Sequence, residues 1–266
     1  MFFRKYLYYF TSIFTLLFQV KPWTRVLRVF LSKKLAENPL VELHPNGLRF
    51  RARSAMDIWS LKETMLDHFY ERFGFPIGSG WTIVDIGGGI GDFTIRAATA
   101  GAGNKVFAFE PTPSSYALIT ENLGMNSVTN VKVFPMAVWS KDGDIEIDTG
   151  IGEPVQFTSQ AAGQGSAAKH GKVVVPGLSL EHALAQNNID CVDLMKLDCE
   201  GAEYEILFKA PDAVLERIQR IVMEYHDNAG PHTHEDMARF LSGKGYKVDV
   251  FPSPVHSYLG YLRASR

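Results

Sequence analysis

The chain has 266 residues, of which 46% are hydrophobic and 21% charged, and its formal net charge is −2. This length accommodates one domain with an extension, and the composition excludes an intrinsically disordered chain. The near-neutral charge argues against a nucleic-acid partner. The two cysteines, Cys191 and Cys199, lie eight residues apart across a predicted strand, so we expect no disulfide between them, and their spacing is not that of a metal site. We therefore predict a reducing, cytoplasmic compartment.

The first 39 residues differ in charge from the rest of the chain. They contain seven Lys or Arg residues and one acidic residue, so this segment carries +6 and the remainder −8. Residues 6–20 are uncharged, but about 15 residues are too few for a membrane-spanning helix, and no signal-peptide cleavage pattern follows. Residues 23–35 have the spacing of a basic amphipathic helix. We predict a basic, aromatic helical segment over residues 1–39. Its residues 1–35 either contact the inner face of a membrane peripherally or cover the catalytic domain or a homo-oligomer interface.

Residues 40–80 predict a lead-in to the main domain. The stretch 40–51 alternates between apolar and polar residues around an Asn-Gly pair, which is a strong short-range signal for a β-hairpin. Residues 57–73 have helical spacing and predict one or two helices. A proline and two glycines then indicate a linker into the main domain, which we place at residues 81–266.

The central motif of the chain is residues 81–93, WTIVDIGGGIGDF. Its first residues form a short, β-branched run that ends in Asp85 and predicts a buried strand. Gly87, Gly89 and Gly91 follow and predict a tight turn that brings the backbone close to a ligand, before a helix begins. A strand, a glycine turn and a helix in this order open the nucleotide-binding half of a doubly wound α/β sheet.

The spacing of this aspartate and the three glycines is typical of S-adenosylmethionine (SAM) sites in Rossmann-like methyltransferases. A phosphate-binding loop would require Gly-Lys-Ser/Thr, and a dinucleotide fingerprint would require glycine at the position of Asp92. We expect Asp85 to orient the turn and the ammonium side of the cofactor. Glu110, about 20 residues after the glycines, is expected to accept hydrogen bonds from both ribose hydroxyls. NAD proteins use the same device, so Glu110 indicates adenosine without selecting the cofactor.

Strands and helices alternate through the rest of the chain, which predicts an α/β domain. Further strands are expected at residues 105–110, 131–138, 192–198 and 220–225, and an antiparallel pair at 246–251 and 257–263. Ala137, near the end of the third strand, is also assigned to the cofactor side.

Residues 144–176 predict an excursion from this alternation. Residues 144–148 and 155–157 have the pattern of a hairpin. Residues 159–169 are small, polar and glycine-rich, which predicts a mobile loop. Residues 173–176 contain a proline and therefore predict a short edge strand.

Charged residues cluster where the fourth strand is expected to end. Lys196 and Asp198 alternate along this buried strand, and Glu200 and Glu203 follow at the start of a helix. Ligands of open α/β sheets bind at the carboxyl ends of the strands. We therefore expect catalytic groups here, although Glu203 also suits a structural place in the first turn of a helix.

A second polar pair lies at the end of the fifth strand. Glu224 and His226 are two residues apart, so their side chains point to the same face. Histidine titrates near neutral pH and is a natural base for a hydroxyl group. Asp198, Glu224 and His226 would together also make a divalent-metal site. No tight ligand motif is present, so we predict no metal and leave this alternative open.

Four blocks of the sequence together resemble the FkbM-type methyltransferases. They are VDIGGGIGDFT, FAFEPTPSSYALITENL, VDLMKLDCEGAEYEIL and IVMEYH, in the order of the family, and the similarity covers residues 57–251. The resemblance implies a class I Rossmann-like fold, a three-layer α/β sandwich with a mostly parallel seven-stranded sheet whose last strand is antiparallel. The helical and hairpin extension precedes it. SAM is implied as methyl donor, with a hydroxyl of a sugar, glycolipid or other small molecule as acceptor.

The resemblance carries over residue by residue to two groups of positions. On the cofactor side it covers Asp85, Gly87, Gly89 and Glu110, and in the later blocks Asp198, Glu200, Glu203, Glu224 and His226. The turn departs from the family, which commonly has Gly-Ala-Asn where this chain has Gly87-Gly88-Gly89, so any contact from that asparagine is absent. Cys199 stands where valine is usual, and we expect its thiol to be a small buried group.

The expected reaction is an in-line attack of an acceptor oxygen on the sulfonium methyl group. The enzyme would align the reactants and remove the hydroxyl proton. His226 or Asp198 is the predicted base, with Lys196 and Glu224 positioning the reactants. Two alternatives remain. An NAD(P)-dependent oxidoreductase or epimerase would be favoured by a Tyr-x-x-x-Lys pair, which the chain lacks, and a non-catalytic SAM-fold protein at a membrane would not need these acidic residues.

Overall fold

A seven-stranded sheet forms the centre of the protein. The computed structural model describes residues 2–31, 38–149, 158–161, 171–253 and 255–266. The strands lie in the order β13 (Lys247–Pro252), β14 (Leu259–Ser265), β12 (Arg220–His226), β11 (Leu194–Leu197), β4 (Thr82–Ile86), β5 (Lys105–Phe109) and β6 (Val131–Phe134). β14 runs in the opposite direction to the other six strands, so its pairings with β12 and β13 are antiparallel and the remaining pairings are parallel. This strand order with its antiparallel seventh strand confirms the predicted class I methyltransferase fold.

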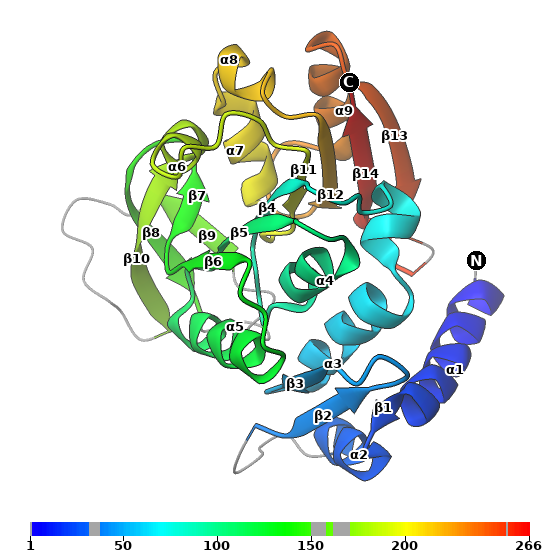
Figure 1. Cartoon of the computed structure of the whole chain (residues 1–266). Coiled ribbons are helices and arrows are strands. Elements are labelled where there is room, and N and C mark those ends of the chain that lie inside the picture. Colours follow the sequence, from blue (N-terminus) through cyan, green and yellow to red (C-terminus); the bar gives the residue numbers. More distant parts are fainter. Residues whose placement is uncertain (1, 32–37, 150–157, 162–170, 254) are drawn as a thin grey trace.

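Helices cover both faces of this sheet, as Figure 1 shows. They are α4 (Asp92–Ala100), α5 (Pro113–Met125), α6 (Leu180–Ala185), α7 (Ala202–Lys209), α8 (Asp212–Leu215) and α9 (His234–Gly243). Alternate strand residues enter different cores: Ile83 packs with Phe93 of α4, whereas Val84 belongs to the cluster that contains Leu207 of α7. The apolar strands are buried on both sides, which is why their sequences are nearly continuous hydrophobic runs.

Capping groups define several helix starts that the sequence predicts. The hydroxyl of Ser179 accepts from the backbone N–H of His182 at the start of α6. Thr233 and Asp236 form a reciprocal capping box at the start of α9. Pro113 stands in the first turn of α5, where its missing N–H costs nothing. The alternation of helices with strands that the sequence predicts is therefore present.

The predicted third strand, residues 131–138, is wrong as a single element. The structure divides it into β6 and β7 (Ala137–Trp139), which belong to different sheets. Pro135 lies between them and has no backbone N–H to continue a ladder. The chain therefore leaves the central sheet at this proline and enters a second one.

The second sheet has four strands in the order β7, β10 (Lys172–Ser179), β8 (Gly143–Asp148) and β9 (Thr158–Ala161). Residues 173–176 pair with β8 alone, so the predicted edge strand is confirmed over these residues, although β10 as a whole lies between β7 and β8. Pairing with β7 begins only at Gly177, one residue after the proline. Residues 159–161 of the predicted loop are a strand, whereas 162–169 and the predicted strand 155–157 lie outside the described residues.

The amino-terminal region packs against one side of the domain. It contains α1 (Phe2–Gln19), β1 (Val20–Lys21), α2 (Trp23–Leu31), the hairpin β2 (Leu40–Leu43) and β3 (Arg49–Arg51), helix α3 (Ala55–Leu61) and two short π-helical turns, η1 (Lys62–Leu66) and η2 (Tyr70–Gly74). The predicted hairpin and helices are confirmed, except that residues 32–35 of the amphipathic helix predicted over 23–35 lie outside the described residues. The three strands form one small sheet. The proposed division at residues 39/40 and 80/81 stays a prediction. Among the described residues, no helix has both the length and the apolar character needed to cross a membrane.

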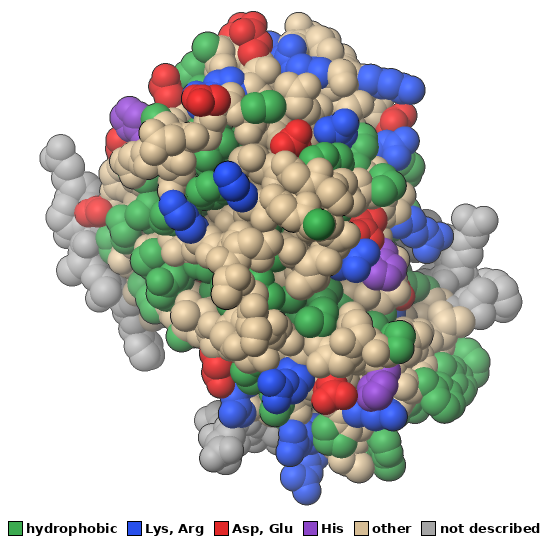
Figure 2. Space-filling view, in the orientation of Figure 1, with side chains coloured by type: hydrophobic (Ala, Val, Ile, Leu, Met, Phe, Trp, Pro, Cys, Tyr) green, Lys and Arg blue, Asp and Glu red, His purple; other side chains and the backbone are tan. Residues whose placement is uncertain are grey.

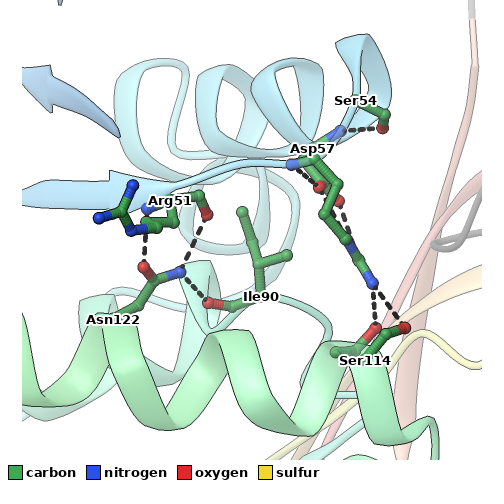
Figure 3. Close-up of polar contacts among 8 residues, drawn as sticks. Arg51, Ser54, Asp57, Ile90, Ser114 and Asn122 are labelled. Carbon is green, nitrogen blue, oxygen red and sulfur yellow. Dashed lines mark hydrogen bonds and ion pairs between the residues drawn. The ribbon is translucent and has the colours of Figure 1, made fainter. Parts of the chain in front are cut away.

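A buried asparagine fastens the hairpin to the domain, as Figure 3 shows. The side-chain amide of Asn122 on α5 accepts from the N–H of Arg51 at 2.8 Å and donates to the Arg51 carbonyl at 3.3 Å. It also donates to the carbonyl of Ile90, just after the glycine turn, at 2.8 Å. One side chain thus completes the edge of β3 and fixes the entry to α4.

Candidate active site

The glycine turn after β4 is held close to the neighbouring strands. The N–H groups of Gly87 and Gly88 both donate to the carbonyl of Phe109, at 3.0 and 3.1 Å. Gly87 has φ +82°, and a Cβ there would lie 1.9 Å from the carbonyl oxygen of Asp198. Only glycine combines this left-handed conformation with such close backbone packing.

The other two glycines have different surroundings. Gly91 is the left-handed N-cap of α4, and a Cβ there would lie 2.7 Å from a side-chain carbon of Ile119. Gly89 has φ +53°, but no atom lies within 4 Å of the position of its Cβ. The turn therefore packs tightly on the domain at Gly87 and Gly91, and its middle at Gly89 has open space beside it.

Glu110 lies at the end of β5 and supports the turn from the other side. Its carboxylate accepts from the N–H of Gly89 and from the N–H of Thr112, both at 2.8 Å. Burial raises the pKa of Glu110 above its ordinary value, although both N–H groups oppose this shift. Because an ionised carboxylate has about four acceptor positions, two remain for a ligand.

A buried ion pair lies beneath the turn. Asp85 and Lys196 are paired in register on the adjacent strands β4 and β11, and Nζ of Lys196 lies 3.1 Å from Oδ1 of Asp85. Nζ also donates to the carbonyl of Gly87 at 2.7 Å, and Thr94 donates to Oδ2 of Asp85 at 2.5 Å. Burial alone would lower the pKa of Lys196, but Asp85 and Asp198 raise it above its ordinary value. The ion pair therefore holds the glycine turn in place through the hydrogen bond from Lys196 to the Gly87 carbonyl.

Two carboxylates on the cavity side are held by hydroxyl groups from the lead-in. The hydroxyl of Tyr70 donates to Oδ2 of Asp198 at 2.6 Å. Burial and the Asp198 carboxylate raise the pKa of Tyr70 well above its usual range, so this hydroxyl keeps its proton. Ser60 and Thr64 donate to Oδ2 of Asp92 at 2.6 and 2.8 Å. Residues 60–70 thus complete the site.

His226 lies between two acidic side chains. Its Nε2 is 3.3 Å from Glu200, and its Nδ1 is 3.4 Å from Glu203. Burial alone would lower the pKa of His226, but the carboxylates of Glu203 and Glu200 raise it well above its ordinary value. The two carboxylates therefore favour the charged imidazole, in which both nitrogens carry a proton and neither can act as a base.

The two glutamates differ in their surroundings. Glu203 is fully buried and accepts from the N–H groups of Cys199 and Gly201, at 2.6 and 2.8 Å. Burial opposes its ionisation, but His226 and these N–H groups hold its pKa below the ordinary value. Burial raises the pKa of Glu200 to about 7, against the opposing effect of His226. Glu203 is therefore a structural anion, and Glu200 titrates near neutrality.

Glu224 completes the cluster at the end of β12. Burial and the nearby Asp198 carboxylate raise its pKa well above the ordinary range. One ligand atom from each of Asp198, Glu224 and His226 lies within 4.8 Å of the others, so the expected convergence of these three is present. Such a spacing would accommodate one divalent cation. The expectation that no metal is used stays a prediction.

A single cavity connects the turn with the acidic cluster. Its lining comprises Ser60, Tyr70, Gly87, Gly89, Ile90, Asp92, Glu110, Pro111, Thr112, Ile147, Lys196, Asp198, Cys199 and Glu200. Six of the residues expected from the sequence are among them. Asp85, Gly91, Glu203, Glu224 and His226 are not part of this lining, and Ala137 is buried in a hydrophobic core cluster. Cys199 is half-buried and lines the cavity, so it is more exposed than expected.

Sequence reasoning missed the contributions of Tyr70, Asp92 and Ser60. Asp92 was considered only as a departure from a dinucleotide fingerprint. Its position directly after the last glycine, at the start of a helix, was the available signal. Tyr70 and Ser60 lie in the lead-in, where only the apolar spacing was used, and nothing in that spacing indicates which polar side chains reach the cavity.

Comparison with known proteins agrees with this geometry. A family model described as the methyltransferase FkbM domain matches residues 85–248, which is more than half of the chain. "Methyltransferase 1" from Beauveria bassiana is 24% identical over 71% of this chain and 80% of its own length. "Hexuronic acid methyltransferase AglP" from Haloferax volcanii is 24% identical over 79% and 82%, respectively. "31-O-demethyl-FK506 methyltransferase FkbM" from Streptomyces tacrolimicus is 25% identical over 79% and 90%. The chain therefore belongs to the FkbM methyltransferase family.

Proposed function

We propose that this protein is a SAM-dependent O-methyltransferase that acts on a hydroxyl of a sugar, glycolipid or other small molecule. The observation that carries the proposal is the shared cavity. Gly87, Gly89 and Glu110 line one side of it, and Asp198 and Glu200 line the other. The names of two relatives, one a hexuronic acid methyltransferase and one a 31-O-demethyl-FK506 methyltransferase, support sugar or small-molecule acceptors.

The donor side has the features that SAM requires. The open space at Gly89 admits a ligand close to the backbone, and α4 begins at this point with its N–H groups directed toward the turn. Glu110 retains acceptor positions for ribose hydroxyls. When bound, SAM supplies a sulfonium methyl group that is electrophilic enough to be transferred to an oxygen.

We assign the general base to Asp198 rather than His226. The raised pKa of His226 keeps this imidazole protonated, and Glu200 and Glu203 already engage both of its nitrogens. Asp198 lines the cavity, and the hydroxyl of Tyr70 fixes one of its oxygens. A positioned carboxylate within reach of an acceptor hydroxyl can remove its proton as the new C–O bond forms.

The neighbouring charged groups have positioning roles in this proposal. Lys196 holds the Gly87 carbonyl and Asp85, so it links the donor turn to the strand that carries Asp198. Burial and the Asp198 carboxylate raise the pKa of Glu224, which favours its neutral form, and a carboxylate oxygen of Glu224 lies within 4.8 Å of Asp198, so we give Glu224 a positioning role toward Asp198.

The direct test is methyl transfer from isotopically labelled SAM. We would incubate the full chain with hexuronates, neutral sugars and extracts of lipid-linked glycans, and identify labelled products by mass spectrometry and NMR. An O-methylated product formed by the wild-type chain and lost in Asp198→Asn supports the proposal. Methylation at nitrogen or carbon, or tight NADH binding without SAM binding in calorimetry, would overturn it.

A further inference from the structure

Helix α1 has two apolar faces, of which the domain covers only one. Ser12 and Leu16 are buried, and the hydroxyl of Tyr8 donates to Glu63 of η1 at 2.7 Å. The opposite face carries six exposed large hydrophobic residues, Tyr6, Phe10, Ile13, Phe14, Leu17 and Phe18. They recur at three- and four-residue spacing, so they form one continuous stripe along the helix.

Helix α2 extends this surface. Val26 and Val29 are buried, whereas Trp23, Leu27, Phe30 and Leu31 are exposed, and Leu31 is 77% exposed. We call the ten exposed side chains of α1 and α2 the N-terminal apolar patch. Elsewhere in the described chain only one large hydrophobic residue is comparably exposed, Tyr258. Figure 2 shows hydrophobic side chains gathered over α1 at the lower right of the molecule. A concentration of this kind marks an interaction surface.

Positive charges border the N-terminal apolar patch. Lys21, Arg25 and Arg28 are exposed, and no acidic residue occurs between residues 1 and 36. Arg28 lies three residues before Leu31, so the two are neighbours on the helix surface. Residues 1–39 carry +6, whereas the rest of the chain carries −8. An anionic surface would therefore attract this end and repel the body.

The charge pattern selects among the surfaces that would cover such a patch. A two-fold dimer through this patch would bring two copies of the same basic segment into one interface with no acidic residue between positions 1 and 36 to pair with them. A bilayer with anionic headgroups instead pairs with the arginines and accepts the aromatic side chains at its interface. Tyr, Trp and Phe side chains are well suited to that interface.

We propose that α1 and α2 dock the protein on the surface of an anionic lipid bilayer. The exposed stripe of α1 and the face of α2 around Trp23 enter the headgroup region, and Lys21, Arg25 and Arg28 contact lipid phosphates. The inner face of α1 stays on η1, so docking requires no unfolding. Because α1 packs on η1 and Thr64 of η1 donates to Asp92 at the cavity, the docked helix is connected to the wall of the candidate site through η1.

The test uses the full chain with vesicles of phosphatidylcholine, alone or mixed with phosphatidylglycerol. In co-sedimentation, we expect the affinity for the anionic vesicles to be at least about tenfold higher than for pure phosphatidylcholine vesicles, and to fall as salt is added. The triple variant Phe10→Ser, Phe18→Ser, Leu31→Ser should lose at least about tenfold in vesicle affinity, because each side chain is exposed and would enter the lipid. Arg28→Gln should lose about fivefold on the anionic vesicles only.

Matched controls separate docking from general effects. Tyr258→Ser removes an exposed aromatic residue elsewhere, and Lys141→Gln removes an exposed charge outside this region; both should bind vesicles as the wild type does. Circular dichroism melting should be unchanged in the triple variant. Wild-type protein that stays in solution with anionic vesicles would overturn the proposal. So would a self-association in sedimentation equilibrium that the triple variant abolishes, because the patch would then be an interface between copies.

Discussion

The donor side and the acidic side of the cavity are built in different ways. The donor side depends on backbone: Gly87 and Gly88 donate to the Phe109 carbonyl, and Gly87 lies where any Cβ would meet the Asp198 carbonyl. The acidic side depends on side-chain charge: Glu200 is partly buried and His226 is buried, and the pKa values of both are raised. The first is therefore sensitive to added volume and the second to lost charge.

One residue belongs to both constructions. Asp198 supplies its carbonyl to the close approach at Gly87 and its carboxylate to the cavity. Backbone packing and candidate chemistry thus meet at the end of β11. Substitutions that add volume without changing charge, or remove charge without changing volume, should show whether SAM binding and methyl transfer depend on backbone packing or on side-chain charge.

The largest effect is expected for Gly87→Ala. Its methyl group would lie 1.9 Å from the Asp198 carbonyl oxygen, and the residue has φ +82°. The turn must therefore move, and we expect SAM binding to be lost and the free energy of unfolding to fall by roughly 2–4 kcal/mol. Calorimetry and urea unfolding measure the two effects.

Gly89→Ala is the matched control for this substitution. Gly89 also has a left-handed conformation, but no atom lies within 4 Å of the position that the Cβ of alanine would take. We expect a loss of only about 1 kcal/mol in stability. If both alanine variants lost the same free energy of unfolding, the result would contradict the role assigned to the close approach at Gly87.

The next largest effect is expected for Asp198→Asn, which keeps volume and removes charge. If Asp198 removes the acceptor proton, kcat should fall by roughly 100- to 10,000-fold, while the Kd for SAM changes by less than about threefold. Tyr70→Phe, which removes only the hydroxyl that fixes Asp198, should cost much less. Single-turnover rates and SAM titrations separate these effects, and a near-normal rate in Asp198→Asn would sink the assignment of the base.

A smaller effect is expected for Glu110→Gln on the donor side. A neutral amide accepts ribose hydroxyls more weakly than a carboxylate, and its NH2 group would face the N–H of Gly89 or Thr112. The affinity for SAM should fall about 10- to 100-fold, with kcat at saturating SAM largely retained. Glu121→Gln, an exposed change on α5, is the control and should bind SAM as the wild type does. A fall in kcat alone would place Glu110 outside the cofactor site.

The smallest effect concerns pH and Glu200. Its pKa is about 7 in the folded protein and 4.5 by reference, so between these values the folded state binds more protons than the unfolded state. The free energy of unfolding therefore falls as pH rises through this window and levels off above it. Glu200→Gln should remove roughly 1–2 kcal/mol of this decline, measured by urea unfolding at about pH 5 and pH 8. Exposed Glu216→Gln should leave the decline intact; a Glu200→Gln profile identical to wild type would refute the shifted pKa.

The sequence by itself determined the fold class and identified six of the residues that line the cavity. Period-two runs, glycine spacing and capping residues are local signals, so β4, α4 and the ends of β11 and β12 were predictable. The convergence of Asp198, Glu224 and His226 followed from the rule that parallel strands end at one edge, whereas the pairing of Asp85 with Lys196 was found only in the structure.

Only the tertiary structure decided what each of these groups can do. The raised pKa of His226 arises from Glu203 and Glu200, which follow β11 in the chain and lie beside the end of β12 only in the folded protein, so it could not be inferred from the reference value of an isolated histidine. Tyr70 contacts Asp198 across 128 residues of chain. The departure of the chain at Pro135 into a second sheet, and the uncovered outer face of α1, likewise depend on contacts between distant segments. Local patterns fix conformation, whereas burial and charge proximity, which set chemistry, are properties of the assembled fold.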